Sequence, residues 1–221
     1  MISIRNATAE DMDEIMRVEQ SWPEDARAPA DAMLARIEKF AKGFFLAIER
    51  DEDGAELVVA TITTMPMYFT DGSIHEFTSW DEVTDNGYLR DYDMQRCNAL
   101  YIVSGVIDSN YRGGNIFTPM VLREVELAAG LGLRYVLAGA VMPGYRKYVD
   151  KHGPVPAYDY TRLRRGKHLV DPLLAMYEAI DFHVPNPHHV LQEYYPDDAS
   201  KNYAALVMRD LEASPFKPEQ G

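Results

Sequence analysis

The chain has 221 residues, of which 47% are hydrophobic and 26% charged, a balance typical of a globular protein with one sizeable core. Its 22 basic and 35 acidic side chains give a formal net charge of 22 − 35 = −13, and the densest basic run, residues 162–168, is short. The hydrophobic content excludes disordered and fibrous proteins. A nucleic-acid partner is not expected, because binding to phosphates requires clustered Lys and Arg.

The cysteine count and the apolar runs indicate the compartment. Cys97 is the only cysteine, so no disulfide can form within the chain and a reducing compartment is expected. Residues 1–6 carry no apolar signal core, and no apolar run approaches the roughly 20 residues that a membrane span requires. We therefore expect a cytoplasmic protein with no membrane partner.

The N-terminal third predicts a strand, two helices and a β-hairpin. Residues 2–5 alternate as in a short strand, and Thr8 stands at the capping position before apolar residues at helical spacing. A second helix is predicted over residues 29–43, opened by a proline and ended by a glycine. Two β-rich runs, 44–50 and 56–63, flank an Asp-Gly turn and predict a hairpin.

The middle of the chain predicts a βαβ unit that follows an irregular insertion. Residues from about 66 to 97 mix aromatic and acidic side chains, and we interpret them as an insertion that packs near a functional site. A strand over residues 98–107 leads through Gly113 and Gly114 into a helix, and residues 134–139 form the next strand. Such a unit places its two strands side by side and parallel.

The C-terminal third predicts one more helix and two strands. Residues 143–167 are rich in loop-forming side chains, and no element is assigned to them. A last helix is predicted over residues 171–180, and the runs 190–192 and 204–208 are expected to close the sheet. No repeat or linker divides the chain, so we expect one domain over residues 1–221.

The most informative segment is 106–117, between a predicted strand and a predicted helix. Unpaired amides at a helix start form a site for anions, and small residues let a pyrophosphate approach the main chain. A glycine-rich turn alone is an unspecific signal. Its place in the chain is more specific, since it follows two helices and a hairpin and precedes a strand and a helix that carries Tyr177.

This order of elements resembles the GNAT superfamily of N-acetyltransferases. The likeness runs from residues 4–11 through the Tyr-Arg-Gly-Gly loop at 111–114 to the tyrosine-containing segment that ends at Phe182. It implies an α+β fold with a mixed, mostly antiparallel twisted sheet, a central parallel strand pair and flanking helices. Four short segments are similar, more narrowly, to acetyltransferase-like domains that are sometimes fused to nitrilase-type amidohydrolases: residues 80–84, 143–145, 171–172 and 196–198.

The resemblance implies acetyl-CoA as the cofactor. The family pattern of the pyrophosphate loop aligns with Arg112, Asn115 and Phe117, and the last two depart from the small residues that the family has there. Pro119 prefers the first helical position, which predicts a helix that begins late with Thr118 as its cap. The implied cofactor-binding residues are Val106, Ile107, Arg112, Gly113, Gly114, Asn115, Ile116, Phe117 and Thr118.

The implied reaction is attack of a small-molecule primary amine on the thioester. An alkyl amine of pKa about 10.4 is protonated at neutral pH, so a base must first take its proton. The resemblance assigns the oxyanion-stabilising amide to Val106 or a neighbour, and the proton donor for the leaving thiolate to Tyr177.

No general base stands out, and the insertion supplies the candidates for it and for the acceptor pocket. The candidate bases are His75, Glu76, Asp85, Asp91 and Asp93. The candidate substrate-binding residues are Trp80, Tyr88 and Glu76.

Other interpretations stay open. Tyr177 shares a helical stripe with Leu173, Leu174 and Ile180, so it would also serve as a core aromatic residue. The protein could act on an acyl thioester without acetylating amines, as a decarboxylase or a longer-chain acyl transferase. It could also bind CoA as a non-catalytic regulatory module, and a free sheet edge is compatible with a homodimer.

Two further chemistries are not favoured. His183, His188 and His189 lack the spacing and the Cys partners of a zinc site, so no metal is expected. Cys97 lies beside a predicted strand and is more typical of a small hydrophobic residue than of a nucleophile.

Overall fold

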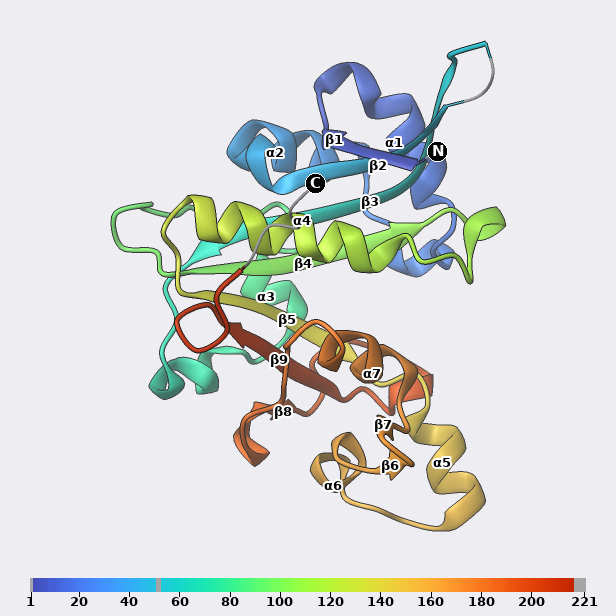
Figure 1. Cartoon of the computed structure of the whole chain (residues 1–221), viewed down its shortest axis with the longest axis vertical. Helices are drawn as coiled ribbons and strands as arrows, with labels where there is room; N and C mark the ends of the chain where they lie inside the picture. Colours follow the sequence, from blue (N-terminus) through green and yellow to red (C-terminus); the bar gives the residue numbers. More distant parts are fainter. Residues whose placement is uncertain (1, 51–52, 217–221) are drawn as a thin grey trace.

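The computed structural model describes residues 2–50 and 53–216 and contains a seven-stranded sheet in the order β1-β2-β3-β4-β5-β9-β8 (Figure 1). All neighbouring strands are antiparallel except β4 and β5, which are parallel. The mixed α+β sheet with a central parallel pair is therefore confirmed. The strands are β1 (Ile2–Asn6), β2 (Phe44–Arg50), β3 (Glu56–Met67), β4 (Ala99–Ile107), β5 (Tyr135–Val141), β8 (Val190–Leu191) and β9 (Ala204–Asp210).

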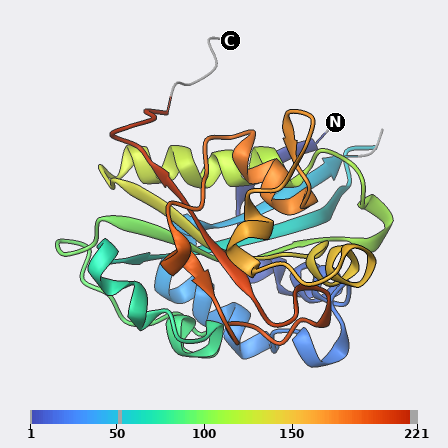
Figure 2. The same ribbon diagram turned by 90° about the horizontal axis from the view of Figure 1, so that it is seen from below.

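Helices cover both faces of the sheet. Figure 2 shows α4 (Phe117–Gly130) on one side, and α1 (Met12–Glu19) and α2 (Ala30–Phe40) on the other. Apolar residues of α1 and α2 pack with β2 in one core, and those of α4 pack with β3, β4 and β5 in a larger one. The middle of β3 is buried without alternation, because a strand covered on both faces has no solvent side.

The strands β4 and β5 diverge after four paired residues. Their pairing ends at Ile102 and Ala138, although β4 continues to Ile107 and β5 to Val141. The register between β3 and β4 shifts at the same point, so that Val103 has no partner in β3. A bulge bends a strand and increases its twist, which opens a gap between the second halves of β4 and β5.

The N-terminal elements follow the prediction. Thr8 caps the 3-10 helix η1 (Ala9–Asp11), which leads directly into α1. The two strands of the predicted hairpin pair as β2 and β3, while residues 51–52 of its turn lie outside the described residues.

The C-terminal helix α7 (Pro172–Glu178) is also present and is held by its cap residue. The carboxylate of Asp171 accepts hydrogen bonds from the amides of Leu173 and Leu174 at 3.0 and 3.2 Å. The same carboxylate accepts from the amide of Gly144, after β5, and from the hydroxyl of Tyr160. Asp171 therefore fixes α7 against the end of β5, and α7 carries Tyr177.

The unassigned segment 143–167 contains two helices and the first strand of a hairpin, whose second strand follows it directly. These are α5 (Tyr145–His152), α6 (Ala157–Thr161), β6 (Arg164–Arg165) and β7 (His168–Leu169). The ring centroids of Tyr145 and Tyr148 lie 4.9 and 5.5 Å from that of Tyr160, so α5 and α6 are held by aromatic contacts. Elements this short carry little apolar periodicity, which is why the sequence did not indicate them.

The insertion also has structure of its own. The strand β3 continues through Pro66, which is tolerated because pairing with β2 already ends at Thr63. The 3-10 helix η4 (Asp71–Glu76) and the short helix α3 (Trp80–Thr84) follow. In the described parts of the chain, no helix is long and apolar enough to cross a bilayer.

Candidate active site

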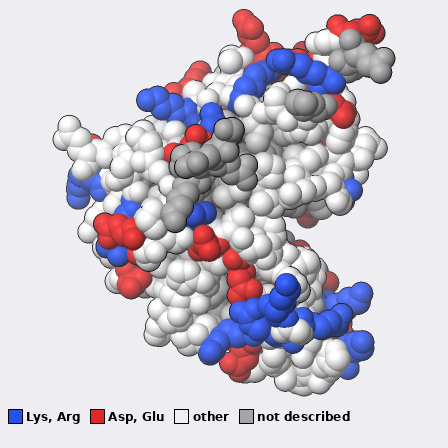
Figure 3. Space-filling view, in the orientation of Figure 1, with Lys and Arg blue, Asp and Glu red and all other residues white. Residues whose placement is uncertain are grey.

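A cavity of about 1210 Å³ lies where β4 and β5 diverge. Its walls are the second halves of both strands, the α1–α2 connection, the loop before α4, and α7. The space-filling view in Figure 3 shows a deep notch on the right-hand side of the molecule, at the ends of these strands. Seven predicted site residues line the cavity: Trp80, Val106, Ile107, Arg112, Gly113, Phe117 and Tyr177.

The amides of β4 differ in the direction they face. The amide of Asp108 donates to the carbonyl of Val59 in β3 at 2.9 Å, and bonds to an antiparallel neighbour recur at every second residue. The amide of Val106, which pairs with Thr61, therefore also faces β3. The amides of Gly105 and Ile107 face the side from which β5 has diverged. These two amides, and not that of Val106, are therefore the candidate hydrogen-bond donors to a ligand in the cavity.

The start of α4 differs from the prediction. The helix begins at Phe117 with Ile116 as its N-cap, so Thr118 is not the cap and Pro119 lies at the third helical position. The first amides of a helix lack intrahelical partners, so a residue without an N–H fits within this turn. Of the residues in this first turn, Phe117 lines the cavity, so its amide remains as a donor for an anion there.

The loop that enters α4 is open and anchored at both ends. Gly113 has φ +88°, a conformation that suits glycine, and no atom lies within 4 Å of the position its Cβ would take. Asp108 accepts from the amide of Asn110 at 2.9 Å and forms an ion pair with Arg17. The guanidinium of Arg112 donates to the carbonyl of Ser21 at 2.7 Å, which ties the loop to the α1–α2 connection. Four other predicted cofactor-binding residues do not line the cavity: Gly114, Asn115, Ile116 and Thr118.

Tyr177 lies between the core and the cavity. It is 3% exposed, and its ring centroid lies 5.2 Å from that of Phe182. Burial, together with the nearby Tyr101, raises the pKa of its hydroxyl, so it stays protonated at any working pH. No hydrogen bond of this hydroxyl is found among the described residues, which leaves it free to bond a ligand in the cavity.

Trp80 anchors the insertion on the bulge of β4. Its indole Nε1 donates to the carbonyl of Val103 at 2.8 Å, and its backbone amide donates to the carbonyl of Tyr194 at 2.8 Å. The indole thereby satisfies a carbonyl in the region where β4 and β5 separate.

The other predicted residues of the insertion lie elsewhere. The hydroxyl of Tyr88 donates to Asp31 at 3.0 Å outside the cavity wall, and Glu76 is exposed on η4. The remaining candidate bases, His75, Asp85, Asp91 and Asp93, are also exposed and do not line the cavity.

The structure adds a carboxylate that the sequence analysis missed. Glu19, at the end of α1, is 2% exposed and lines the cavity. Its Oε1 accepts from the amide of Ala28 at 2.8 Å, whereas Oε2 has no hydrogen-bond partner among the described residues. Burial raises the pKa of this carboxyl, against the opposing effects of the Ala28 amide and the charges of Arg36 and Arg27. A carboxylate of raised pKa in a cavity is suited to accept a proton.

A buried arginine faces the same cavity. Arg36 of α2 is 1% exposed; its Nε donates to the carbonyl of Gly87 at 2.7 Å and its Nη1 to Ser104 Oγ at 2.9 Å. Burial lowers the pKa of the guanidinium to about 10, partly offset by the charge of Glu19. Sequence reasoning missed both residues, because a charged residue on a surface helix is normally solvated and only the packing of the α1–α2 connection buries them.

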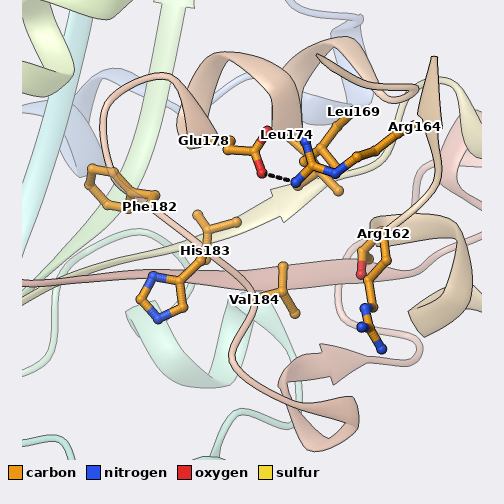
Figure 4. Close-up of a pocket in the computed structure, with 10 residues that line it drawn as sticks. Arg162, Arg164, Leu169, Leu174, Glu178, Phe182, His183 and Val184 are labelled. Atoms are coloured by element: carbon orange, nitrogen blue, oxygen red, sulfur yellow. Dashed lines mark hydrogen bonds and ion pairs between the residues drawn. The ribbon is translucent and has the colours of Figure 1, made fainter. Parts of the chain in front are cut away.

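A smaller cavity of about 280 Å³ lies away from this site, between α7 and the segment around His183 (Figure 4). An ion pair between Arg164 Nη2 and Glu178 Oε1, 2.5 Å apart, lies at its edge, and none of the predicted site residues lines it. His183 lines this cavity, and His189 is fully buried with neither ring nitrogen hydrogen-bonded to a described residue.

A curated bacterial protein is similar in sequence to most of this chain. No protein-family profile matches the chain. A Bacillus subtilis (strain 168) protein named "Probable hydrolase YhcX" is 24% identical over 209 residues, which are 92% of this chain. The chain spans only 37% of the length of that relative.

Three solved structures place the chain in a fold class. The loading GNATL domain of CurA from Lyngbya majuscula is 18% identical with a TM-score of 0.77, covering 96% of this chain and 99% of that one. The GphF GNAT-like decarboxylase in complex with isobutyryl-CoA is 19% identical with a TM-score of 0.72, covering 95% and 99%. The yncA structure from Salmonella typhimurium, with acetyl-CoA, is 12% identical with a TM-score of 0.56, covering 97% and 96%. The chain therefore has the GNAT fold.

Proposed function

We propose that this protein transfers an acetyl or other short acyl group from acyl-CoA to the primary amine of a small molecule. The observation that carries the proposal is the meeting, in one cavity, of the free amides of β4, the start of α4 and the buried carboxylate of Glu19. Neighbours of the same fold were solved with isobutyryl-CoA and acetyl-CoA, which supports acyl-CoA as the donor.

The residues present fit such a donor. The amide of Phe117 at the start of α4 and the open main chain at Gly113 suit a pyrophosphate, and Arg112 adds a positive charge beside them. The unpaired edge of β4 suits the amide groups of the pantetheine arm, as a neighbouring strand would. The ring of Phe117 packs against Gly105 as one wall of the cavity and leaves the cavity open.

The side chains then have separate chemical roles. Acyl-CoA supplies an activated thioester carbonyl. Glu19 accepts a proton from the ammonium group of the acceptor, and the amide of Gly105 or Ile107 donates a hydrogen bond to the negative charge that develops on the acyl oxygen. Tyr177 donates a hydrogen bond to the leaving thiolate; full proton transfer is uphill, because a thiol has a pKa of only about 8.5.

A second candidate function is decarboxylation of an acyl thioester. The GphF decarboxylase and the CurA loading domain align with TM-scores of 0.72 and 0.77, whereas yncA aligns with 0.56. A decarboxylase would release carbon dioxide from a malonyl-type thioester with no amine present.

Thiol release distinguishes these functions. The purified protein is incubated with acetyl-CoA, alone and with a panel of primary amines, while free thiol is measured. We expect thiol to appear only when an amine is added. Carbon dioxide from malonyl-CoA without an amine would identify the decarboxylase instead, and binding of CoA without either reaction would leave a regulatory module.

A further inference from the structure

Two opposite charges are buried on one side of the cavity. Glu19, at the end of α1, and Arg36, on α2, both line the cavity and are at least 98% buried. Both helices lie on the face of the sheet opposite α4, whose start suits the pyrophosphate. The pair therefore lies on the side of the cavity that remains for an acceptor.

The charges of Glu19 and Arg36 act on each other across the cavity wall, and Arg27 adds a second positive charge near Glu19, but neither member of the pair has an ion-pair partner in contact with it among the described residues. Oε2 of Glu19 has no hydrogen-bond partner, and neither Glu19 nor Arg36 takes part in an ion pair. Nη2 of Arg36 lies beside Gly87, where an added Cβ would come within 2.7 Å of it, and no hydrogen bond of Nη2 is found in the described parts of the chain. A buried charge with no counter-ion in direct contact is costly, so these groups are suited to ligand atoms of opposite charge.

A ligand with a single charge fits this site poorly. An ammonium group alone would pair with Glu19 but would bring a second cation near Arg36. A carboxylate alone would pair with Arg36 but would be repelled by ionised Glu19. Only a small molecule with both groups pairs each buried charge and leaves none unmatched.

We infer that the acceptor is an amino acid whose carboxylate binds Arg36 and whose ammonium group binds Glu19. This inference rests on the proposed acyl transfer and names the class of its acceptor. Arg36 is tied to β4 through Ser104, the neighbour of Gly105, so the bound carboxylate is held beside the strand that carries the free amides.

The transfer balances with these groups. The nitrogen of the amino acid forms a bond to the acyl carbon while the bond from that carbon to sulfur breaks. Two protons leave the nitrogen: Glu19 takes the first and releases it to water, and the second ends on the leaving thiolate. The products are an N-acyl amino acid and CoA.

The inference is tested by matched acceptors with acetyl-CoA as the donor. Each of a set of α-, β- and γ-amino acids is compared with its methyl ester and with the amine that lacks its carboxyl group. We expect kcat/KM for the best amino acid to exceed both matched compounds at least 100-fold, because each of them leaves Arg36 unpaired. A ratio below 10 overturns the inference.

Variants locate the two groups. We expect Arg36→Gln to raise KM for the amino acid at least tenfold, to leave KM for acetyl-CoA unchanged and to remove the preference over the methyl ester. If Arg36→Gln fails to fold, Arg36→Lys takes its place. This variant keeps a cation, and we expect it to retain part of the preference for the amino acid over its methyl ester. Glu19 accepts a proton only when it is ionised, so kcat should rise with pH as Glu19 loses its own proton. We expect Glu19→Gln to lower kcat and to abolish this rise. Arg123→Gln, which removes an exposed arginine on α4, serves as the control.

The outcomes separate this inference from the proposed function. Thiol release with simple amines but not with amino acids overturns the amino-acid acceptor and leaves the acyltransferase intact. The protein could instead release carbon dioxide from malonyl-CoA without an amine, and Arg36→Gln could abolish this release. That result would mean that Arg36 binds the carboxylate of the acyl group, and it would overturn both the amino-acid acceptor and the acyl transfer.

Discussion

The ring of Phe117 lies directly against the backbone of Gly105, so closely that a Cβ added to Gly105 would lie 2.8 Å from Cζ of the ring and closer still to Cε2. The start of α4 and the free edge of β4 meet at this contact. We expect Gly105→Ala to push the ring or the strand aside and to lower the free energy of unfolding by about 1–3 kcal/mol. Urea unfolding measures this loss of stability. When Phe117→Ala has already removed the ring, Gly105→Ala should cost less. An unchanged midpoint for Gly105→Ala would contradict the contact.

Phe117 lines the cavity beside β4, where the proposed reaction places the acyl group. Phe117→Ala should let a longer acyl chain enter beside β4. Each buried methylene contributes about 0.8 kcal/mol, so we expect kcat/KM for butyryl-CoA relative to acetyl-CoA to rise about tenfold. The ratio is measured by thiol release with one amine. If both donors respond equally to the substitution, the ring does not border the acyl group.

Tyr177 offers a hydroxyl that can be removed with little structural change. A hydrogen bond to a charged group contributes about 1.5–3 kcal/mol, so Tyr177→Phe should lower kcat about 10- to 100-fold. The melting temperature should stay close to that of the unchanged protein. Tyr88→Phe removes a hydroxyl outside the cavity and should leave kcat unchanged. Full turnover of Tyr177→Phe would show that the residue is only a core aromatic.

Trp80 supports the bulge through a single hydrogen bond. Trp80→Phe leaves the carbonyl of Val103 without its donor, and a buried unpaired carbonyl costs about 1–3 kcal/mol. We expect the free energy of unfolding to fall by that amount and KM for acetyl-CoA to rise. Chemical denaturation and initial-rate kinetics measure the two effects. A loss of stability with unchanged KM would mean that the bulge does not shape the donor site.

Glu124 of α4 makes the stability depend on pH. It is fully buried, with Oε2 2.9 Å from Thr64 Oγ1, and burial raises the pKa of its carboxyl well above the usual range. The folded protein therefore keeps a proton that the unfolded chain loses above pH about 4.3. Between that pH and the folded pKa, the native state binds more protons, so stability falls as pH rises, by about 1.4 kcal/mol per unit.

The variant Glu124→Gln isolates this contribution. A neutral amide keeps a hydrogen bond to Thr64 and has no proton to lose, so the variant should lack this decline and be more stable than the unchanged protein at alkaline pH. Urea unfolding between pH 5 and 9 measures it. Parallel pH profiles for the two proteins would show that Glu124 is not protonated in the fold.

The sequence predicts the order of elements well because the signals are local. Alternation and helical spacing identify β1, the β2–β3 hairpin and α2 from neighbouring residues alone. The succession of strand, glycine turn, helix and strand predicts a parallel pair, which β4 and β5 form. The short elements between residues 143 and 167 escaped, because aromatic contacts rather than periodicity hold them.

By itself, the sequence determined the order of the elements and the loop before α4, since both follow from local patterns, while its resemblance to the GNAT superfamily implied the topology of the sheet. Only the tertiary structure decided which groups face the cavity. The register of β4 against β3 turns the amide of Val106 away, and a strand's register depends on its partner and not on its own residues. Glu19 and Arg36 become a buried pair of opposite charges only when the α1–α2 connection packs over them, because burial depends on distant segments brought together by folding.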